Sequence, residues 1–231
     1  RDLLRHAVGR FRAAGIAFGH GTTSALDEAA FILLEGLSLP IDDLNPWLDA
    51  RLTRSERLRL LDLVEQRVAT RKPASYLLGR AYIQGIPFRV DERVIVPRSY
   101  LGELMMSGGL VQEGAGPVPD PMAVTRILDL CTGSGCLAIL AAMAFPEATI
   151  DAVDLSAEAL EVAGLNVADH DMRDRISLLA GDLFAPVAGR HYDLIIANPP
   201  YVAEAEVSAF PPEYRAEPVM AHVGGADGLD I

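Results

Sequence analysis

Strand-like apolar runs alternate with helix-like segments between residues 126 and 197, and this alternation constrains the fold most strongly. We expect strands at residues 126–131, 149–154, 176–180 and 192–197, with helices at residues 136–144 and 157–169. Strands that alternate with helices form a parallel sheet covered by helices on both faces. The second half of the chain is therefore predicted to be an α/β domain with such a sheet.

The first 72 residues have a helical pattern and contain no convincing strand. The first predicted helix ends near Gly15, the second runs from about residue 24 to 37, and a Thr53–Glu56 capping box begins the third. The apolar residues expected to face inward are Leu3, Leu4, Ala7, Val8, Phe11, Leu26, Ala29, Ala30, Leu33, Leu34, Leu58, Leu61 and Val68. We interpret residues 1–79 as a helical bundle suited to docking a substrate.

Short extended pieces follow the bundle and flank Gly85. They lie at residues 81–83, 87–90 and 94–96, so residues 80–97 are predicted to form a β-hairpin linker. A helix is expected between Tyr100 and Met106, followed by a loop over the Gly- and Pro-rich residues 107–124. The second domain then covers residues 98–231.

Composition and charge argue against several classes of protein. The 231 residues carry a formal net charge of −12, which disfavours a broad phosphate-binding face and fits a basic protein partner. Cys131 and Cys136 are too few for a disulfide framework and lack metal-ligand spacing. We expect both cysteines to be reduced thiols in a cytoplasmic protein, and no run approaches the roughly 20 apolar residues of a membrane span. Because the chain begins at Arg1 without a methionine, we interpret it as a fragment.

A glycine-rich turn with the sequence Asp-Leu-Cys-Thr-Gly-Ser-Gly joins the first strand to its helix at residues 129–135. Its glycines let the backbone approach a ligand at a helix N-terminus, on the carboxyl edge of the sheet. Asp154 ends the second strand, where an acid can bind a ribose diol in a NAD enzyme or in an S-adenosylmethionine enzyme. The glycine pattern alone does not separate these two cofactors.

Two other acids favour S-adenosylmethionine. Asp129, just before the glycines, can accept a hydrogen bond from the cationic α-amino group of an amino-acid-like ligand. Asp182, after the third strand, can accept from an adenine amine while Leu183 or Phe184 covers the ring. The residues predicted to contact the cofactor are Asp129, Cys131, Thr132, Gly133, Ser134, Gly135, Asp154, Leu155, Asp182, Leu183 and Asn198.

Asn198-Pro199-Pro200-Tyr201 follows the fourth strand and is predicted to be catalytic. The asparagine amide offers both an acceptor and donors, and the successive prolines leave the Pro199 carbonyl free to accept. The Tyr201 ring offers a flat face for a planar amide or base. These residues suit the task of holding a planar NH2 group beside a methyl donor, and no metal is implied.

Two other polar residues, His20 and Arg98, lie outside these motifs. His20 lies between two glycines in a loop between helices, where we expect a surface or capping role. Arg98 follows Pro97 and is predicted either to reach the cofactor or to brace the linker, and the sequence leaves both open.

In combination these motifs resemble the glutamine N5-methyltransferases that modify translation proteins. Asp-x-x-Thr-Gly-Ser-Gly, Ala-Val-Asp and Asn-Pro-Pro-Tyr occur in the order and spacing of that family. Gly19-His20-Gly21-Thr22, residues 96–104 and residues 129–132 are similar to the subfamily that acts on a ribosomal protein, and residues 212–218 also match the family. The release-factor subfamily usually has glycine at the position of Cys131 and a Pro-Asp-Thr-Glu stretch after the arginine.

The resemblance implies a Rossmann-like class I methyltransferase sheet, S-adenosyl-L-methionine as cofactor, and glutamine methylation of a basic large-subunit ribosomal protein. The family's sheet has seven strands and four are readable here, so we expect the last three to be absent from this chain. Three alternatives remain: a release-factor glutamine methyltransferase, an adenine or guanine N-methyltransferase, and a non-catalytic ribosome-binding scaffold. The acidic charge balance counts against direct nucleic-acid binding.

Overall fold

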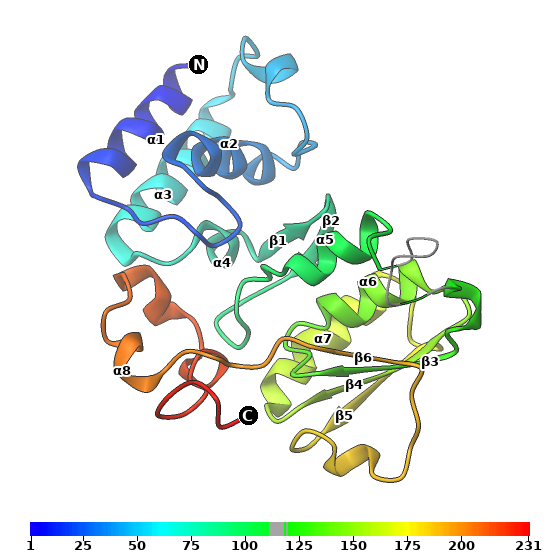
Figure 1. Cartoon of the computed structure of the whole chain (residues 1–231). Helices are drawn as coiled ribbons and strands as arrows, with labels where there is room; N and C mark the ends of the chain where they lie inside the picture. The colour runs from blue at the N-terminus through cyan, green and yellow to red at the C-terminus, as the bar shows by residue number, and fades with distance from the viewer. Residues whose placement is uncertain (111–117, 119) are drawn as a thin grey trace.

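The computed structural model describes residues 1–110, 118 and 120–231, and it places a helical bundle beside an α/β sheet (Figure 1). The bundle consists of α1 (Asp2–Ala13), α2 (Ala25–Gly36), α3 (Arg54–Thr70) and the short α4 (Ala74–Leu78), with the 3-10 turn η1 (Asn45–Trp47) between α2 and α3. The Thr53–Glu56 capping box begins α3 as predicted. Residues 111–117 and 119 of the predicted loop at residues 107–124 lie outside the described residues. No helix in the described part of the chain is long and apolar enough to cross a membrane.

The inward faces of α2 and α3 differ from the prediction. Leu26 and Leu58 were expected in the core but are 54% and 58% exposed. The buried face of α2 contains Glu28, whose carboxylate accepts a hydrogen bond from the fully buried Arg67 of α3 at 2.5 Å. Burying this pair rotates both helices away from the purely apolar register, so that Ile32 takes a core position instead.

A hairpin joins the bundle to the sheet. β1 (Arg80–Ile83) and β2 (Ile86–Arg89) pair antiparallel across a two-residue turn, in which Gln84 and Gly85 both have positive φ. The third extended piece, at residues 94–96, forms no strand. Its Val94 and Val96 are nevertheless buried, and the carbonyl of Val94 accepts a hydrogen bond from the Tyr76 hydroxyl.

The sheet is parallel and has the strand order β5-β4-β3-β6. Its strands are β3 (Arg126–Leu130), β4 (Thr149–Asp154), β5 (Ile176–Ala180) and β6 (Leu194–Ala197), and its connecting helices are α6 (Cys136–Ala144) and α7 (Ala157–Asp169). Both helices and two of the strands coincide with their predicted ranges. The four strands that were readable in the sequence are the four strands of the described sheet.

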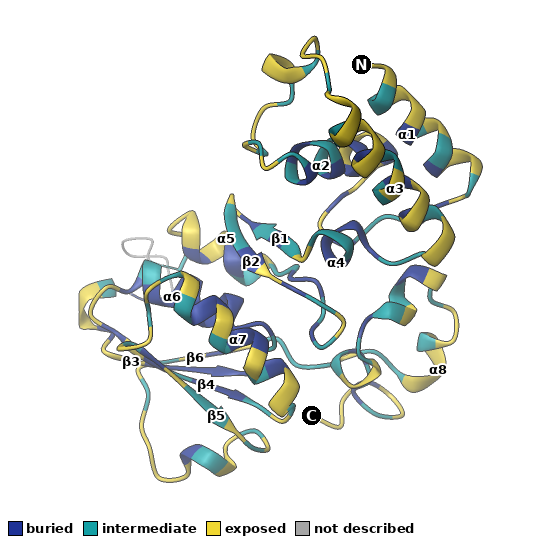
Figure 2. Cartoon of the chain, turned by 180° about the vertical axis from the view of Figure 1, so that it is seen from behind, coloured by how far each residue is buried: buried dark blue, intermediate teal, exposed yellow. Residues whose placement is uncertain are grey.

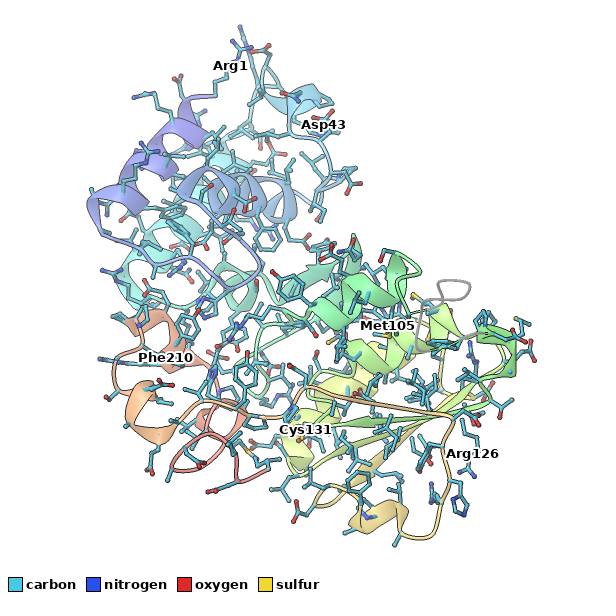
Figure 3. The ribbon with its side chains drawn as sticks, in the orientation of Figure 1. Arg1, Asp43, Met105, Arg126, Cys131 and Phe210 are labelled. Atoms are coloured by element: carbon cyan, nitrogen blue, oxygen red, sulfur yellow. The ribbon has the colours of Figure 1, made fainter. Side chains whose placement is uncertain are left out.

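In the described part of the chain, helices cover one face of this sheet, whereas the alternation of strands and helices had predicted helices on both faces. α5 (Tyr100–Met106), α6 and α7 contribute to the core on one face, where α6 is buried along most of its length (Figure 2). Met105 of α5, labelled in Figure 3, belongs to this core.

The opposite face receives only a short turn in the described part of the chain. Between β5 and β6 the chain forms the 3-10 turn η3 (Ala185–Val187), and Val187 packs against Leu128 and Val153. Pro186 lies in the first turn of η3, where its missing N–H would have no partner within the helix.

After β6 the chain leaves the sheet and returns toward the bundle (Figure 1). This C-terminal segment contains α8 (Glu204–Val207), η4 (Pro212–Ala216) and η5 (Val219–Ala221), and a parallel bridge joins Val202 to Val223. A further 3-10 turn, η2 (Pro121–Ala123), precedes β3.

Candidate active site

The site lies where the direction of strand succession reverses. The chain proceeds from β3 outward through β4 to β5 and then returns to place β6 on the other side of β3. Open parallel sheets bind ligands at such a switch point, beyond the carboxyl ends of the strands. A cavity opens here between the strand ends, the linker and the C-terminal segment, and most of the predicted cofactor residues line it: Cys131, Thr132, Gly133, Ser134, Asp154, Leu155, Asp182, Leu183 and Asn198.

The glycine-rich turn has the backbone geometry that its sequence suggested. Gly133 and Gly135 have φ of 55° and 77°, in the left-handed region that favours glycine. A Cβ on Gly135 would lie 3.1 Å from the Ala163 Cβ, so this glycine lets the start of α6 pack against α7. Gly135 does not line the cavity, and its role is to support the turn.

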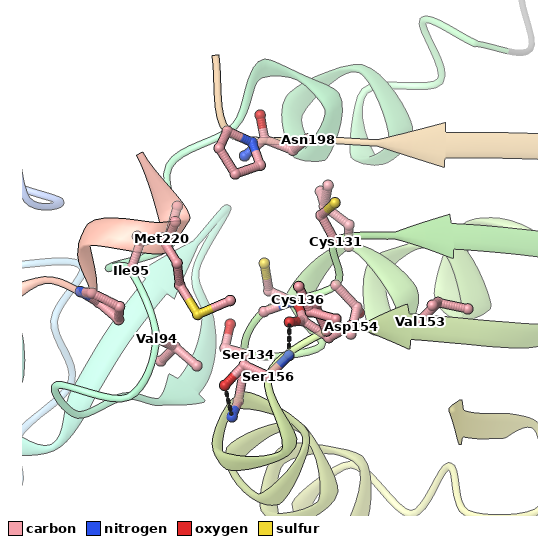
Figure 4. A pocket seen from close by; sticks show the side chains of 18 of the residues that line it. Val94, Ile95, Cys131, Ser134, Cys136, Val153, Asp154, Ser156, Asn198 and Met220 are labelled. Carbon is pink, nitrogen blue, oxygen red and sulfur yellow. Dashed lines mark hydrogen bonds between the residues drawn. The ribbon is translucent and has the colours of Figure 1, made fainter. Parts of the chain in front are cut away.

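Asp154 fixes the turn against the next strand. One carboxylate oxygen accepts from the Gly133 N–H at 2.7 Å, and the other accepts from the Ser156 N–H at 2.9 Å. A carboxylate has further lone pairs, so Asp154 can still accept from a ligand hydroxyl. Figure 4 shows it beside Ser156 on the wall of the cavity.

Asp129 lies behind the cavity wall and does not line the cavity itself. Its side chain is fully buried and accepts from the Thr132 hydroxyl at 2.6 Å, while its Oδ1 has no hydrogen-bond partner among the described residues. Burial raises the pKa of Asp129 to about 7, against the lowering effect of the Thr132 hydrogen bond. An acceptor without a partner directly behind the turn is suited to a cationic donor from a ligand.

The cavity combines acids with apolar surface. Asp182 is exposed at its rim, Leu155 is 63% exposed beside it, and Leu183 has a positive φ of 43° at the end of β5. Phe184, the alternative to Leu183 for covering an adenine ring, does not line the cavity. Burial raises the pKa of the Cys131 thiol to about 11, so this cysteine is neutral in the site.

A second hollow adjoins the first, and Asn198 lines both. Pro199 and Tyr201 line only the second hollow, and Pro200 lines only the first. The Tyr201 ring is 70% exposed there, and Asn198 is half-buried. In Figure 4 the Asn198 amide makes no hydrogen bond to the other residues drawn.

Arg98 also lines both hollows. The residues around it were not identified as part of the site from the sequence. Its guanidinium donates two hydrogen bonds to the buried Glu217, at 2.8 and 2.7 Å. His20 was expected at the surface but is 2% exposed, with its Nε2 3.5 Å from Glu217. The predicted surface position of His20 was wrong because the acid beside it, Glu217, lies almost 200 residues away in the sequence. The match of residues 212–218 to the family was the only signal that could have pointed to Glu217.

Comparison with known proteins gives the family. A family model for the methyltransferase small domain matches residues 118–210. The ribosomal protein uL3 glutamine methyltransferase of Bordetella pertussis is 54% identical, over 100% of this chain and 76% of that protein. The protein of the same name from Bradyrhizobium diazoefficiens is 56% identical, over 100% of this chain and 72% of that protein.

Among solved structures, the hMettl16 catalytic domain in complex with MAT2A 3'UTR hairpin 6 covers 79% of this chain and 63% of its own. It is 15% identical, with a TM-score of 0.46, a likeness too limited to bear on function. The sequence similarity extends over the whole chain. The structure of the chain brings most of the predicted residues at the strand ends around one cavity. This chain belongs to the ribosomal protein uL3 glutamine methyltransferase family.

Proposed function

We propose that this protein transfers a methyl group from S-adenosylmethionine to the side-chain amide nitrogen of a glutamine in ribosomal protein uL3. The observation that carries the proposal is the position of Asn198, which lines both the cavity at the strand ends and the adjoining hollow. A donor bound in the first and an amide bound in the second would meet at this side chain.

The donor cavity has a residue set that fits S-adenosylmethionine. Its acids, Asp154 and Asp182, suit a ribose diol and an adenine amine, and Leu155 and Leu183 supply apolar surface for the base. The buried Oδ1 of Asp129, which has no partner in the described residues, suits the cationic α-amino group. When bound, the cofactor supplies an electrophilic methyl group on a sulfonium.

The acceptor hollow would orient a nitrogen that is a poor nucleophile, because an amide lone pair is delocalised into its carbonyl. The Asn198 side-chain oxygen and the Pro199 carbonyl would accept the two N–H bonds of the glutamine amide. Two aligned acceptors fix the nitrogen and offset the positive charge that develops on it as the new bond forms. Tyr201 would pack on the amide plane, and the nitrogen would give up one proton to water in the open hollow once its bond to the methyl carbon has begun to form.

The partner follows from the relatives and from charge. They are named for uL3, and a net charge of −12 suits a basic protein such as a ribosomal protein. We assign residues 1–79 to substrate docking, residues 80–97 to the linker and residues 98–231 to methyl transfer. A ribosomal protein substrate supports our expectation of a cytoplasmic reaction, and the acidic net charge supports our expectation that the substrate is not a nucleic acid.

The test is methylation of purified uL3 with isotope-labelled S-adenosylmethionine, followed by mass spectrometry of the modified peptide. We expect Asn198→Ala to bind the donor within a few fold of the unaltered protein and to lose roughly 100-fold or more in kcat. Asp174→Ala, which changes an exposed side chain between α7 and β5 that lines neither hollow, is the control and should retain full turnover. Absence of label on a uL3 glutamine with the unaltered protein, or normal turnover by Asn198→Ala, would contradict the proposal.

A further inference from the structure

Residues 217–228 run beside both hollows, and we name this segment the C-terminal strap. Pro218, Met220 and Ala221 of the strap line the donor cavity, and Ala221 and His222 line the acceptor hollow. Figure 4 shows the Met220 side chain reaching into the cavity from η5. The strap therefore supplies part of the wall of both hollows.

One end of the strap is anchored to the linker by Glu217. The buried Glu217 carboxylate accepts from the Val96 N–H at 2.9 Å and from both terminal nitrogens of Arg98. His222, within the strap, has its Nε2 3.0 Å from the same carboxylate. Burial alone would raise the pKa of Glu217, but the hydrogen bonds from Arg98 and the nearby His20 and His222 rings outweigh it and lower the pKa. The anchor is thus an ionised carboxylate held by several donors.

The other end is joined to the chain just after Tyr201 by backbone hydrogen bonds. The Val202 N–H donates to the His222 carbonyl at 2.9 Å, and the Gly224 N–H donates to the Val202 carbonyl at 3.0 Å. The Glu204 N–H donates to the Gly225 carbonyl at 3.0 Å. These bonds make a short parallel seam between the strap and the residues that follow the Asn-Pro-Pro-Tyr turn.

Two glycines let the strap approach the backbone of that turn. A Cβ on Gly224 would lie 2.6 Å from the Pro200 carbonyl oxygen, and a Cβ on Gly228 would lie 2.4 Å from the Tyr201 carbonyl oxygen. Both distances are shorter than any ordinary contact, and both neighbours are backbone atoms. Only glycine at these positions leaves the carbonyls where they are.

We infer that the C-terminal strap is a positioning element for Asn198 and Pro199, with Gly224 and Glu217 as its positioning residues. The seam and the glycine contacts hold the Pro200–Tyr201 backbone, and the Glu217 anchor holds the strap against the linker. The expected effect on kcat rests on the proposed function. The expected effect on the backbone after Tyr201 rests only on the hydrogen bonds of the seam.

The test uses Gly224→Ala, with Gly9→Ala as the matched control because a Cβ on Gly9 meets nothing within 4 Å. Hydrogen–deuterium exchange should be faster at Val202 and Glu204 in Gly224→Ala and unchanged in Gly9→Ala. Because small misplacements of reacting groups cost up to about 100-fold in rate, we expect kcat on uL3 to fall at least about 10-fold. The dissociation constant for S-adenosylmethionine should stay within about 3-fold, since a merely unfolded site would lose donor binding as well.

A second variant, Glu217→Gln, tests the anchor. It also tests whether the strap positions the turn if Gly224→Ala does not fold. We expect weaker donor binding together with lower kcat, because the strap and Arg98 both line the donor cavity. Unchanged exchange at Val202 and Glu204, or unchanged kcat, in both folded variants would overturn the inference. If the unaltered protein leaves uL3 unmodified, the proposed function fails, while the exchange rates still decide whether the strap holds the turn.

Discussion

Replacing Asp129 with asparagine removes the titration of one fully buried carboxyl group and keeps its shape. Burial raises the pKa of Asp129 from its ordinary value of 3.8 to about 7. Between those values the folded protein holds a proton on this residue, whereas the unfolded chain has released it. The stability of the protein therefore depends on pH through Asp129.

The magnitude follows from the two pKa values. Since one pKa unit corresponds to about 1.4 kcal/mol, the rise from 3.8 to about 7 corresponds to on the order of 4 kcal/mol. Because the folded-state pKa is the higher one, this contribution is fully present below pH 4 and is lost as pH rises through 7. Asparagine does not titrate, so the variant lacks this loss.

Urea unfolding of both proteins at pH 4.5 and pH 7.5 measures the effect. The free energy of unfolding of Asp129→Asn minus that of the unaltered protein should increase by about 3 kcal/mol from pH 4.5 to pH 7.5. Most of the titration of Asp129 lies inside this window. The variant should also bind S-adenosylmethionine more weakly, if the carboxylate receives the α-amino group.

Asp193→Asn is the control, because the pKa of Asp193 is shifted in the opposite direction from that of Asp129. Backbone hydrogen bonds from Thr125 and Arg126 lower the pKa of Asp193, so this carboxylate titrates below pH 4 and outside the window. Its stability difference from the unaltered protein should be the same at both pH values. The same flat difference for Asp129→Asn would refute the reasoning, because it would mean that Asp129 is already ionised in the folded protein at pH 4.5.

Three other outcomes are expected. Glu213→Gln should lower the free energy of unfolding by about 3 kcal/mol, because Glu213 is a fully buried carboxylate beside the buried Arg67. Thermal unfolding measures this effect, and an unchanged Tm would contradict it. Thr53→Ala should cost about 1 kcal/mol through loss of the capping box, seen as a lower urea midpoint. Cys131 and Cys136 should react slowly with iodoacetamide at pH 8, because burial raises their pKa to about 11 and about 12; rapid labelling of the folded protein in mass spectra would be inconsistent with this.

The sheet domain was predictable nearly to the residue from its sequence. The helices Cys136–Ala144 and Ala157–Asp169 and the strands Thr149–Asp154 and Ile176–Ala180 have the predicted bounds. Each is an apolar run with glycine, aspartate or serine at its ends, so local chemistry defines where it starts and stops. The residues at the strand ends could be assigned to one site, because parallel strands bring their carboxyl ends to one edge.

The bundle was less predictable, because its core contains charges. Apolar periodicity assumes that charged residues face water, and on that basis Leu26 and Leu58 were turned inward. Glu28 and Arg67 are buried instead, since each neutralises the other inside the bundle. A buried ion pair of this kind depends on which helices meet, and no short window of sequence carries that information.

The anchors of the C-terminal segment were missed for the same reason. Glu213 accepts from the Ala17 N–H and from Arg71 of the bundle, and Glu217 accepts from Arg98 of the linker. These partners are separated from the acids by more than 100 residues, so spacing could not reveal them.

These contacts give the C-terminal segment a role that the strand-end motifs alone do not explain. Glu213 ties η4 to the bundle, Glu217 ties the strap to the linker, and Gly224 holds the backbone beside Asn198. One continuous stretch of chain therefore connects the proposed docking domain to the proposed catalytic amide. Both anchors are carboxylates whose side chains are fully buried against arginines, so removing either arginine should leave an uncompensated buried charge and destabilise this stretch.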